Sequence, residues 1–149
     1  MKKIFLALSA FSIFCIISCK QDDSPGDNYE FSNTLPPYVA LSSTSTKTVR
    51  QGNAATFTFQ MRTAMQQAVT ITYNVTGAVT LNNQTVVIER DKTSAVATVN
   101  IPNGVIVPPA TTATATLTVV KAVTADGMQL TLGQKNNPAS QKVTINIIP

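Results

Sequence analysis

In several runs from residue 55 onward, apolar and polar side chains alternate with a period of two. No other pattern in the sequence restricts the possible folds as much. The apolar members of the first two runs are Ala55, Phe57, Phe59 and Met61, then Val69, Ile71, Tyr73 and Val75. Because successive side chains on a strand point to opposite faces, each run predicts a strand with one buried and one solvated face. Residues 38–149 contain no segment with a helical period, so we expect one all-β domain there.

Similar patterns predict the remaining strands. They lie at Val39–Val49, Val86–Ile88, Ala95–Ile101, Ala113–Val119, Met128–Leu132 and Val143–Ile147. Turn-forming residues separate them at Gln51-Gly52-Asn53, Gly77, Asp91-Lys92, Asn103-Gly104, Asp126-Gly127 and Asn136-Asn137-Pro138. Strands of this length with frequent turns are typical of a sandwich, so we expect seven or eight strands in a single antiparallel β-sandwich.

Three stretches resemble a known family. VTITYNVTGAVT, TVVIERDKTSAVATVNI and TATLTVVKAVTADGMQLTLG resemble the Calx-beta type of immunoglobulin-like sandwich and its relatives in Bacteroidota surface lipoproteins. The likeness covers residues 47–148 and rests on strand and turn features that many β-sandwiches share. It implies an immunoglobulin-like fold, and for members that bind calcium it implies clustered carboxylates in the loops at one end.

The chain departs from that calcium-binding pattern. The corresponding loop, PNGVIVPPATT at 102–112, has no carboxylate, whereas calcium takes six to eight oxygens, several of them charged. The acids of the domain are Glu89, Asp91 and Asp126, and the whole chain has no histidine. Glu89 and Asp91 could be read as a glycosidase pair, but Arg90 and Lys92 flank them and favour a solvated turn. We therefore predict no metal site, no cofactor and no enzymatic activity.

Side-chain chemistry gives little support for a glycan or nucleic-acid site. The domain has no tryptophan, and Phe57, Phe59 and Tyr73 lie on alternating apolar faces, so we expect them in the core. Tyr38, which follows two prolines, is the aromatic residue expected to be exposed. Eight basic residues against three acids give residues 38–149 a net charge of +5, which suits anionic lipopolysaccharide or acidic polysaccharide. They are scattered, however, and lysines commonly protect sheet edges. We predict no nucleic-acid partner.

The N-terminal residues have the composition of a secretory signal. Two lysines follow Met1, and the 14 residues from Ile4 to Ile17 carry no charge. This run is shorter than the roughly 20 residues that a transmembrane helix needs. We therefore expect a signal peptide at residues 1–18.

The end of this signal, Ile16-Ile17-Ser18-Cys19, resembles the lipobox of bacterial lipoproteins. The resemblance implies cleavage between Ser18 and Cys19, diacylglycerol on the Cys19 thiol, and a fatty acid such as palmitate on its freed amine. More than one acyl chain makes attachment to a membrane lasting. The alternatives are a signal cleaved elsewhere, or a metal or disulfide site formed with Cys15. A pair of cysteines without histidine is a poor zinc site, and the domain offers no partner thiol.

Residues 19–37 are rich in acidic residues and proline, and we expect a disordered tether that joins the lipid anchor to the domain. Its first residues, Lys20-Gln21-Asp22-Asp23, resemble the acidic export signal of Bacteroidota surface lipoproteins. The resemblance implies an outer-membrane protein that faces the cell exterior, with Lys20, Asp22 and Asp23 as the signal. The alternative is that these carboxylates only solvate a linker.

Two functions follow as hypotheses. The first is a non-catalytic, lipid-anchored interaction module of the cell envelope, whose loops or edge strand contact a protein partner. The second is a glycan-binding accessory lipoprotein of a polysaccharide-uptake system. Exposed aromatic residues or a polar, asparagine-rich loop cluster would favour the second, and a flat, mobile loop end or an open edge strand would favour the first.

Overall fold

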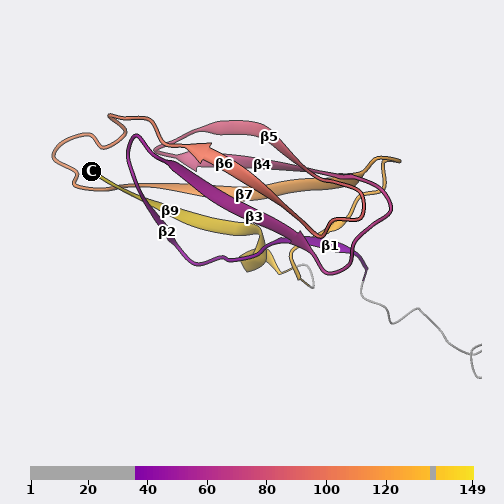
Figure 1. Cartoon of the computed structure of the whole chain (residues 1–149). Helices are drawn as coiled ribbons and strands as arrows, with labels where there is room; N and C mark the ends of the chain where they lie inside the picture. The colour runs from indigo at the N-terminus through magenta and orange to yellow at the C-terminus, as the bar shows by residue number, and fades with distance from the viewer. Residues whose placement is uncertain (1–35, 135–136) are drawn as a thin grey trace, which may run out of the picture. The chain divides into compact units, whose positions relative to one another are not determined.

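The alternating runs form β-strands, as the computed structural model in Figure 1 shows for residues 36–134 and 137–149. In this part of the chain the strands are β1 (Tyr38–Leu41), β2 (Lys47–Arg50), β3 (Ala54–Met61), β4 (Val69–Gly77), β5 (Leu81–Ile88), β6 (Ser94–Asn100), β7 (Ala113–Thr124), β8 (Thr131–Leu132) and β9 (Lys142–Ile148). One short 3-10 helix, η4 (Pro138–Gln141), precedes β9. The predicted all-β class is confirmed for the described residues. The predicted signal peptide and all of the tether up to residue 35 lie outside them.

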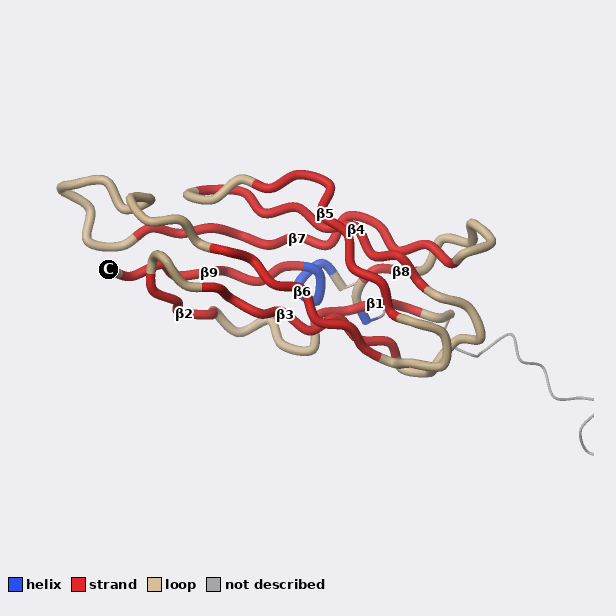
Figure 2. The backbone as a smooth tube through the Cα atoms, turned by 45° about the horizontal axis from the view of Figure 1, so that its top comes forward, coloured by secondary structure: helices blue, strands red, loops and turns tan. Residues whose placement is uncertain are grey.

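The strands form two facing sheets with orders β6-β3-β1-β8 and β2-β9-β7-β4-β5 (Figure 2). Most neighbours are antiparallel, but β1 pairs with β8, and β2 with β9, in parallel. The prediction of a purely antiparallel sandwich was therefore wrong. The reason is that β1 and β2 follow each other in the same direction, and each joins a different sheet beside a strand from the end of the chain.

The predicted single strand Val39–Val49 is also corrected by the structure. The hydroxyl-rich run Ser42–Thr46 is exposed and separates β1 from β2. Only the backbone N–H of Ser42 continues the pairing, by donating to Thr58 O over 2.9 Å. Because these five residues have no apolar member, nothing holds them on either buried face, and the chain crosses from one sheet to the other here.

Two other predicted strands have different limits in the structure. The run Val86–Ile88 is the end of β5, whose earlier residues 82–85 are exposed and polar. Met128–Leu132 contributes only the two residues of β8, because the turn after Thr124 leaves Met128 exposed while Leu130 is buried. The described part thus has nine strands where seven or eight were predicted.

The core lies between the two sheets. Its fully buried side chains include Phe59, Ile71, Leu117 and Ile145, one from each of four central strands. The rings of Phe59 and Tyr73 pack across the two sheets with centroids 5.5 Å apart and planes at 36°. Burial of Phe57, Phe59 and Tyr73 confirms their predicted place in the core. Burial also raises the pKa of the Tyr73 phenol.

Candidate functional site

The loop at residues 102–112 lies at the end of the domain opposite to the point where the described chain begins. β1 pairs Val39 with Met61 at the end of β3, whereas β6 pairs Asn100 with Ala54 at the start of β3. The seven steps between Ala54 and Met61 span about 23 Å at roughly 3.3 Å per residue. Figure 1 shows this loop extending beside the C-terminus. We call residues 102–112 the distal loop.

The base of the distal loop is fixed by hydrogen bonds to the turn between β2 and β3. The N–H of Gly52 donates to Ile101 O over 2.8 Å, and the N–H of Gly104 donates to the side-chain oxygen of Gln51 over 3.1 Å. Gly52 has a φ of +82°, and a Cβ there would lie 2.5 Å from Oδ1 of Asn103. The left-handed φ therefore favours glycine where the turn meets the loop.

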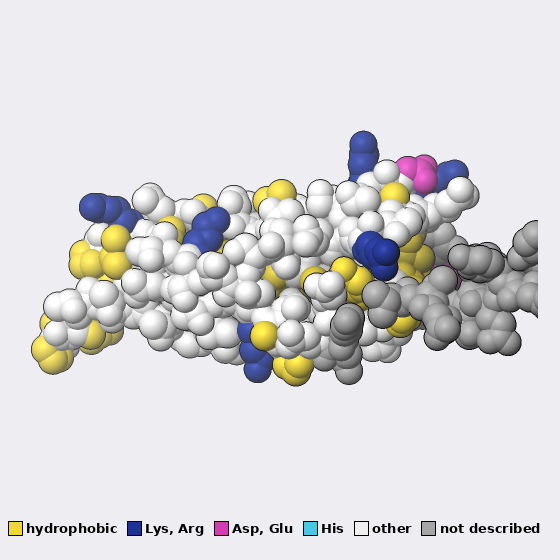
Figure 3. All heavy atoms as spheres, turned by 90° about the horizontal axis from the view of Figure 1, so that it is seen from below, with side chains coloured by type: hydrophobic (Ala, Val, Ile, Leu, Met, Phe, Trp, Pro, Cys, Tyr) yellow, Lys and Arg dark blue, Asp and Glu magenta, His cyan; other side chains and the backbone are white. Residues whose placement is uncertain are grey.

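The tip of the distal loop is apolar and uncharged. Val107 is 69% exposed, while Val105 and Ile106 are half-buried against the core. The N–H of Ala110 donates to Val107 O over 3.0 Å and closes a turn around Pro108 and Pro109. Figure 3 shows hydrophobic side chains gathered at this end of the molecule. The loop therefore presents an exposed apolar tip on a fixed base.

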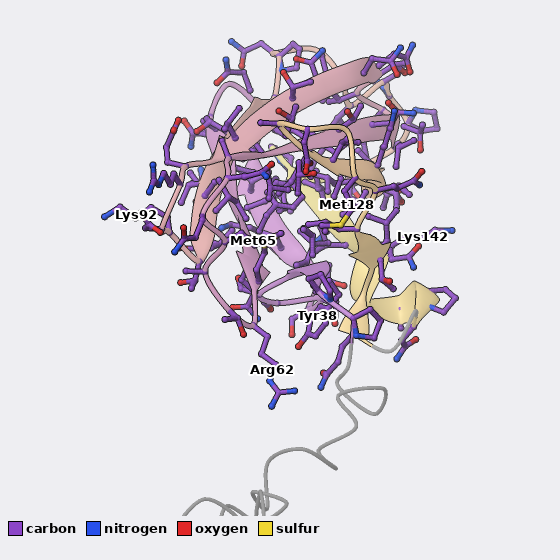
Figure 4. All side chains as sticks on the ribbon, turned by 90° about the vertical axis from the view of Figure 1, so that its right-hand side faces the viewer. Tyr38, Arg62, Met65, Lys92, Met128 and Lys142 are labelled. Atoms are coloured by element: carbon purple, nitrogen blue, oxygen red, sulfur yellow. The ribbon has the colours of Figure 1, made fainter. Side chains whose placement is uncertain are left out.

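A hollow of about 270 Å³ lies at the opposite end, between Pro36–Tyr38 and Met61–Met65. Tyr38 is half-buried there, so its predicted exposure is only partial. Figure 4 shows the side chain of Arg62 pointing away from the domain, and those of Lys92 and Lys142 pointing outward in other directions. The basic residues seen from this end do not converge on one ligand-sized patch, which agrees with their scattered positions in the sequence.

A second hollow of about 280 Å³ lies where the chain crosses between the sheets, beside the run Ser42–Thr46. Its lining is rich in hydroxyl groups: Ser42, Ser43, Ser45, Thr46, Thr56 and Thr58. Lys47 contributes its ammonium group, which donates to Thr56 O over 2.7 Å and lies 5.6 Å from the centre of the Phe57 ring. The combination of hydroxyls with one cation suits a polyhydroxylated, anionic ligand.

The turn that carries Glu89 and Asp91 has the geometry of a solvated turn. Both acids are exposed, and the Arg90 Nε lies 3.2 Å from Asp91 Oδ2. The N–H of Lys92 donates to Glu89 O over 3.0 Å. This confirms the predicted pairing of charges within the turn, and an exposed pair of this kind contributes little to stability.

Asp126 organises the turn between β7 and β8. The Thr124 hydroxyl donates to its carboxylate, and the Gln67 side-chain amide donates to it over 3.2 Å from the loop between β3 and β4. These bonds, chiefly the one from Thr124, lower the pKa of Asp126 below its ordinary value. Within residues 36–134 and 137–149 no three His, Cys, Asp or Glu side chains lie close enough to share a metal ion.

The predicted lipidation, cleavage and export residues Ser18, Cys19, Lys20, Asp22 and Asp23 lie outside the described residues. In the part of the chain that the structure covers, no helix is long and apolar enough to cross a membrane. The sequence prediction considered the distal loop only for its lack of acids. The apolar run Val105-Ile106-Val107, between Asn103-Gly104 and Pro108-Pro109, is the sequence signal that was missed.

Comparison with known proteins adds little. No family model matches the chain, and no curated protein matches it. Among solved structures, the chain is similar to WR4, a C. elegans MSP family member, at 8% identity. The match covers 74% of this chain and 95% of that one, with a TM-score of 0.32. A likeness this low carries no argument about fold or function.

Proposed function

We propose that the domain is an immunoglobulin-like sandwich that serves as a non-catalytic interaction module. The strand order supports the fold: β3 and β6 lie in one sheet, β4, β5 and β7 in the other, and the chain crosses between the sheets after every strand except β4. Resemblance to Calx-beta sandwiches is part of the same proposal. Function depends on a particular site rather than on this fold, and the distal loop supplies the site.

The exposed apolar tip of the distal loop is the observation that carries the proposal. An exposed valine at the tip of a proline-containing turn, with no charged residue from 102 to 112, is suited to a protein partner whose surface has an apolar pocket. The fixed base reduces the entropy that binding would otherwise remove from the loop. Loops at one end of a sandwich are a common place for such contacts.

We further propose that the module is a lipoprotein of the outer membrane that faces the cell exterior. The lipobox ending at Cys19 and the acidic residues after it support this location. The distal loop lies at the domain end opposite Tyr38, where the chain arrives from the proposed anchor. Attachment at that end leaves the loop free to meet a partner.

Photo-crosslinking tests the role of the distal loop. A photoreactive amino acid replaces Val107 in the full chain, and in a control it replaces Thr144, which is exposed on β9. We expect adducts of discrete mass on intact cells from position 107 and none of the same mass from position 144. Identical adducts from the two positions, or none from 107, would contradict the proposal.

The hollow beside Lys47 favours a second candidate, a glycan-binding accessory lipoprotein of a polysaccharide-uptake system. Its hydroxyl lining and single ammonium group suit an acidic polysaccharide. Lys47→Gln should then weaken binding to alginate, whereas Lys142→Gln, which removes the same charge from β9, should not. Equal losses in the two variants would indicate nonspecific attraction by net charge alone.

A further inference from the structure

Strand β6 pairs with β3 on one side, and no strand of the described residues pairs with its other side. The N–H of Ile101 donates to Asn53 O, and Thr93 O accepts from the N–H of Met61, so odd-numbered residues direct their backbone groups toward β3. Backbone groups alternate in direction along an antiparallel strand. The open edge is therefore formed by four even-numbered residues, whose side chains are all exposed: Ser94, Val96, Thr98 and Asn100.

This edge lacks the features that usually prevent pairing with another chain. Ser94–Asn100 has no charged residue and no proline, and its register with β3 is continuous. The other edges of the described sheets differ. β2 carries Lys47 and Arg50, β8 has two residues, and the register of β5 shifts near Asn83, which has a φ of 53°. β6 is thus the long, unprotected edge in this part of the chain.

We propose that two copies of this chain pair through β6, antiparallel and related by a two-fold axis at Ala97. In this register Val96 is opposite Thr98 of the second copy, and Ser94 is opposite Asn100. All seven residues of both strands overlap, and each even-numbered opposed pair joins two residues whose backbone groups point away from β3 in one copy. The two four-stranded sheets become one sheet of eight strands.

The side chains fit this self-pairing. On the outer face, Val96, which is 59% exposed, meets the β-branched Thr98 of the second copy, and Ser94 meets Asn100 as a hydrogen-bonding pair. On the inner face, the small Ala97 lies on the axis, where the Cα atoms of a non-hydrogen-bonded pair approach to about 4.5 Å. A two-fold contact requires a self-complementary sequence, and β6 has one.

A contact through one strand is smaller than the roughly 1,200–2,000 Å² of most stable soluble complexes. Pairing through β6 is therefore weak in dilute solution and strengthened where copies are concentrated on a surface. The strengthening at a surface rests on the proposed lipid anchor, whereas the register of the two β6 strands does not depend on it. Fatty-acid labelling in the same cells separates a failure of anchoring from a failure of pairing.

Register-specific disulfide formation tests the proposal. Two full-length chains with different tags, one Val96→Cys and one Thr98→Cys, are expressed together and exposed to mild oxidant. Opposed residues in this register have Cα atoms about 5.5 Å apart, within disulfide range, whereas two copies of residue 96 are about 7–8 Å apart. We expect mixed-tag dimers to dominate and like-tag dimers to fall to the background level. The unsubstituted chain measures this background, which comes from disulfides formed through Cys15 and Cys19.

Two controls make the result decisive. Thr56→Cys with Thr58→Cys, on the outer face of β3 but away from the edge, should give background only. A chain carrying Ser94→Cys and a differently tagged chain carrying Asn100→Cys should also form mixed dimers. Adding both Val96→Lys and Thr98→Lys to each of these chains should abolish the dimers, because like charges then lie opposite each other. Adding Thr56→Lys and Thr58→Lys instead should leave cross-linking unchanged. Absence of mixed dimers, or like-tag dimers in equal yield, would overturn the proposed pairing.

Discussion

Replacing Phe59 by alanine tests whether the register of β3 in the structure is correct. Phe59 is fully buried, and its ring packs on Tyr73 of the opposite sheet. Loss of a buried phenylalanine costs about 3–5 kcal/mol, through lost transfer free energy and the cavity left behind. A domain of this size has a total unfolding free energy of about 5–15 kcal/mol. Phe59→Ala should therefore remove about a fifth or more of the stability of the domain.

The measurement is urea unfolding of the full chain, followed by far-ultraviolet circular dichroism. Phe59→Ala should lower the midpoint strongly with little change in slope, since the surface exposed on unfolding is almost the same. Gln60→Ala, on the solvated face of the same strand, should change the unfolding free energy by less than about 0.5 kcal/mol. A one-residue slip of β3 would exchange the two faces. If Gln60→Ala proved the more damaging change, our assignment of the buried face would be wrong.

Four further outcomes are expected. Cys19→Ser should abolish labelling by a fatty-acid probe, and unchanged labelling would refute the anchor. Replacing Asp22 and Asp23 by alanine should protect the domain from protease on intact cells, whereas equal sensitivity would mean that the aspartates only solvate the linker. The thermal midpoint should be the same in millimolar calcium and in chelator, and a rise of several degrees would reveal a missed site. Because the pKa of Asp126 is lowered in the fold, its stabilising contribution is present above the ordinary value of 3.8 and is lost as pH falls through the lower folded value. Asp126→Asn should therefore reduce the fall in the urea midpoint at acidic pH. An unchanged pH profile of the midpoint would contradict this expectation.

Alternation predicted the central strands well because each of them has one buried face. β3, β4 and β7 lie between two neighbours and pack against the opposite sheet, so their side chains follow the period of two. β5 is the last strand in the order of its sheet, and its exposed residues 82–85 show no alternation of apolar and polar side chains. The parallel pairs β1–β8 and β2–β9 join residues far apart in sequence, and no local pattern records which distant strand lies alongside.

Prediction of the candidate site was less complete, for a related reason. The pairing of Arg90 with Asp91 joins neighbours in sequence and could be predicted. The distal loop becomes recognisable as a site only when the ladder between β3 and β6 places it opposite Tyr38, and when the exposure of Val107 is known. The open edge of β6 likewise depends on knowing that β3 pairs with one side of the strand and that no described strand pairs with the other.

The pairing of β2 with β9 affects the order in which the domain can form. β9 is the last strand of the described chain, yet it lies between β2, from the start of the domain, and β7. During synthesis from the N-terminus, this sheet stays incomplete until β9 has emerged. Long-range pairings of this kind form slowly, because a long loop must close before they contribute. We therefore expect this five-stranded sheet to be completed after the four-stranded sheet, whose last strand, β8, precedes β9 in the chain.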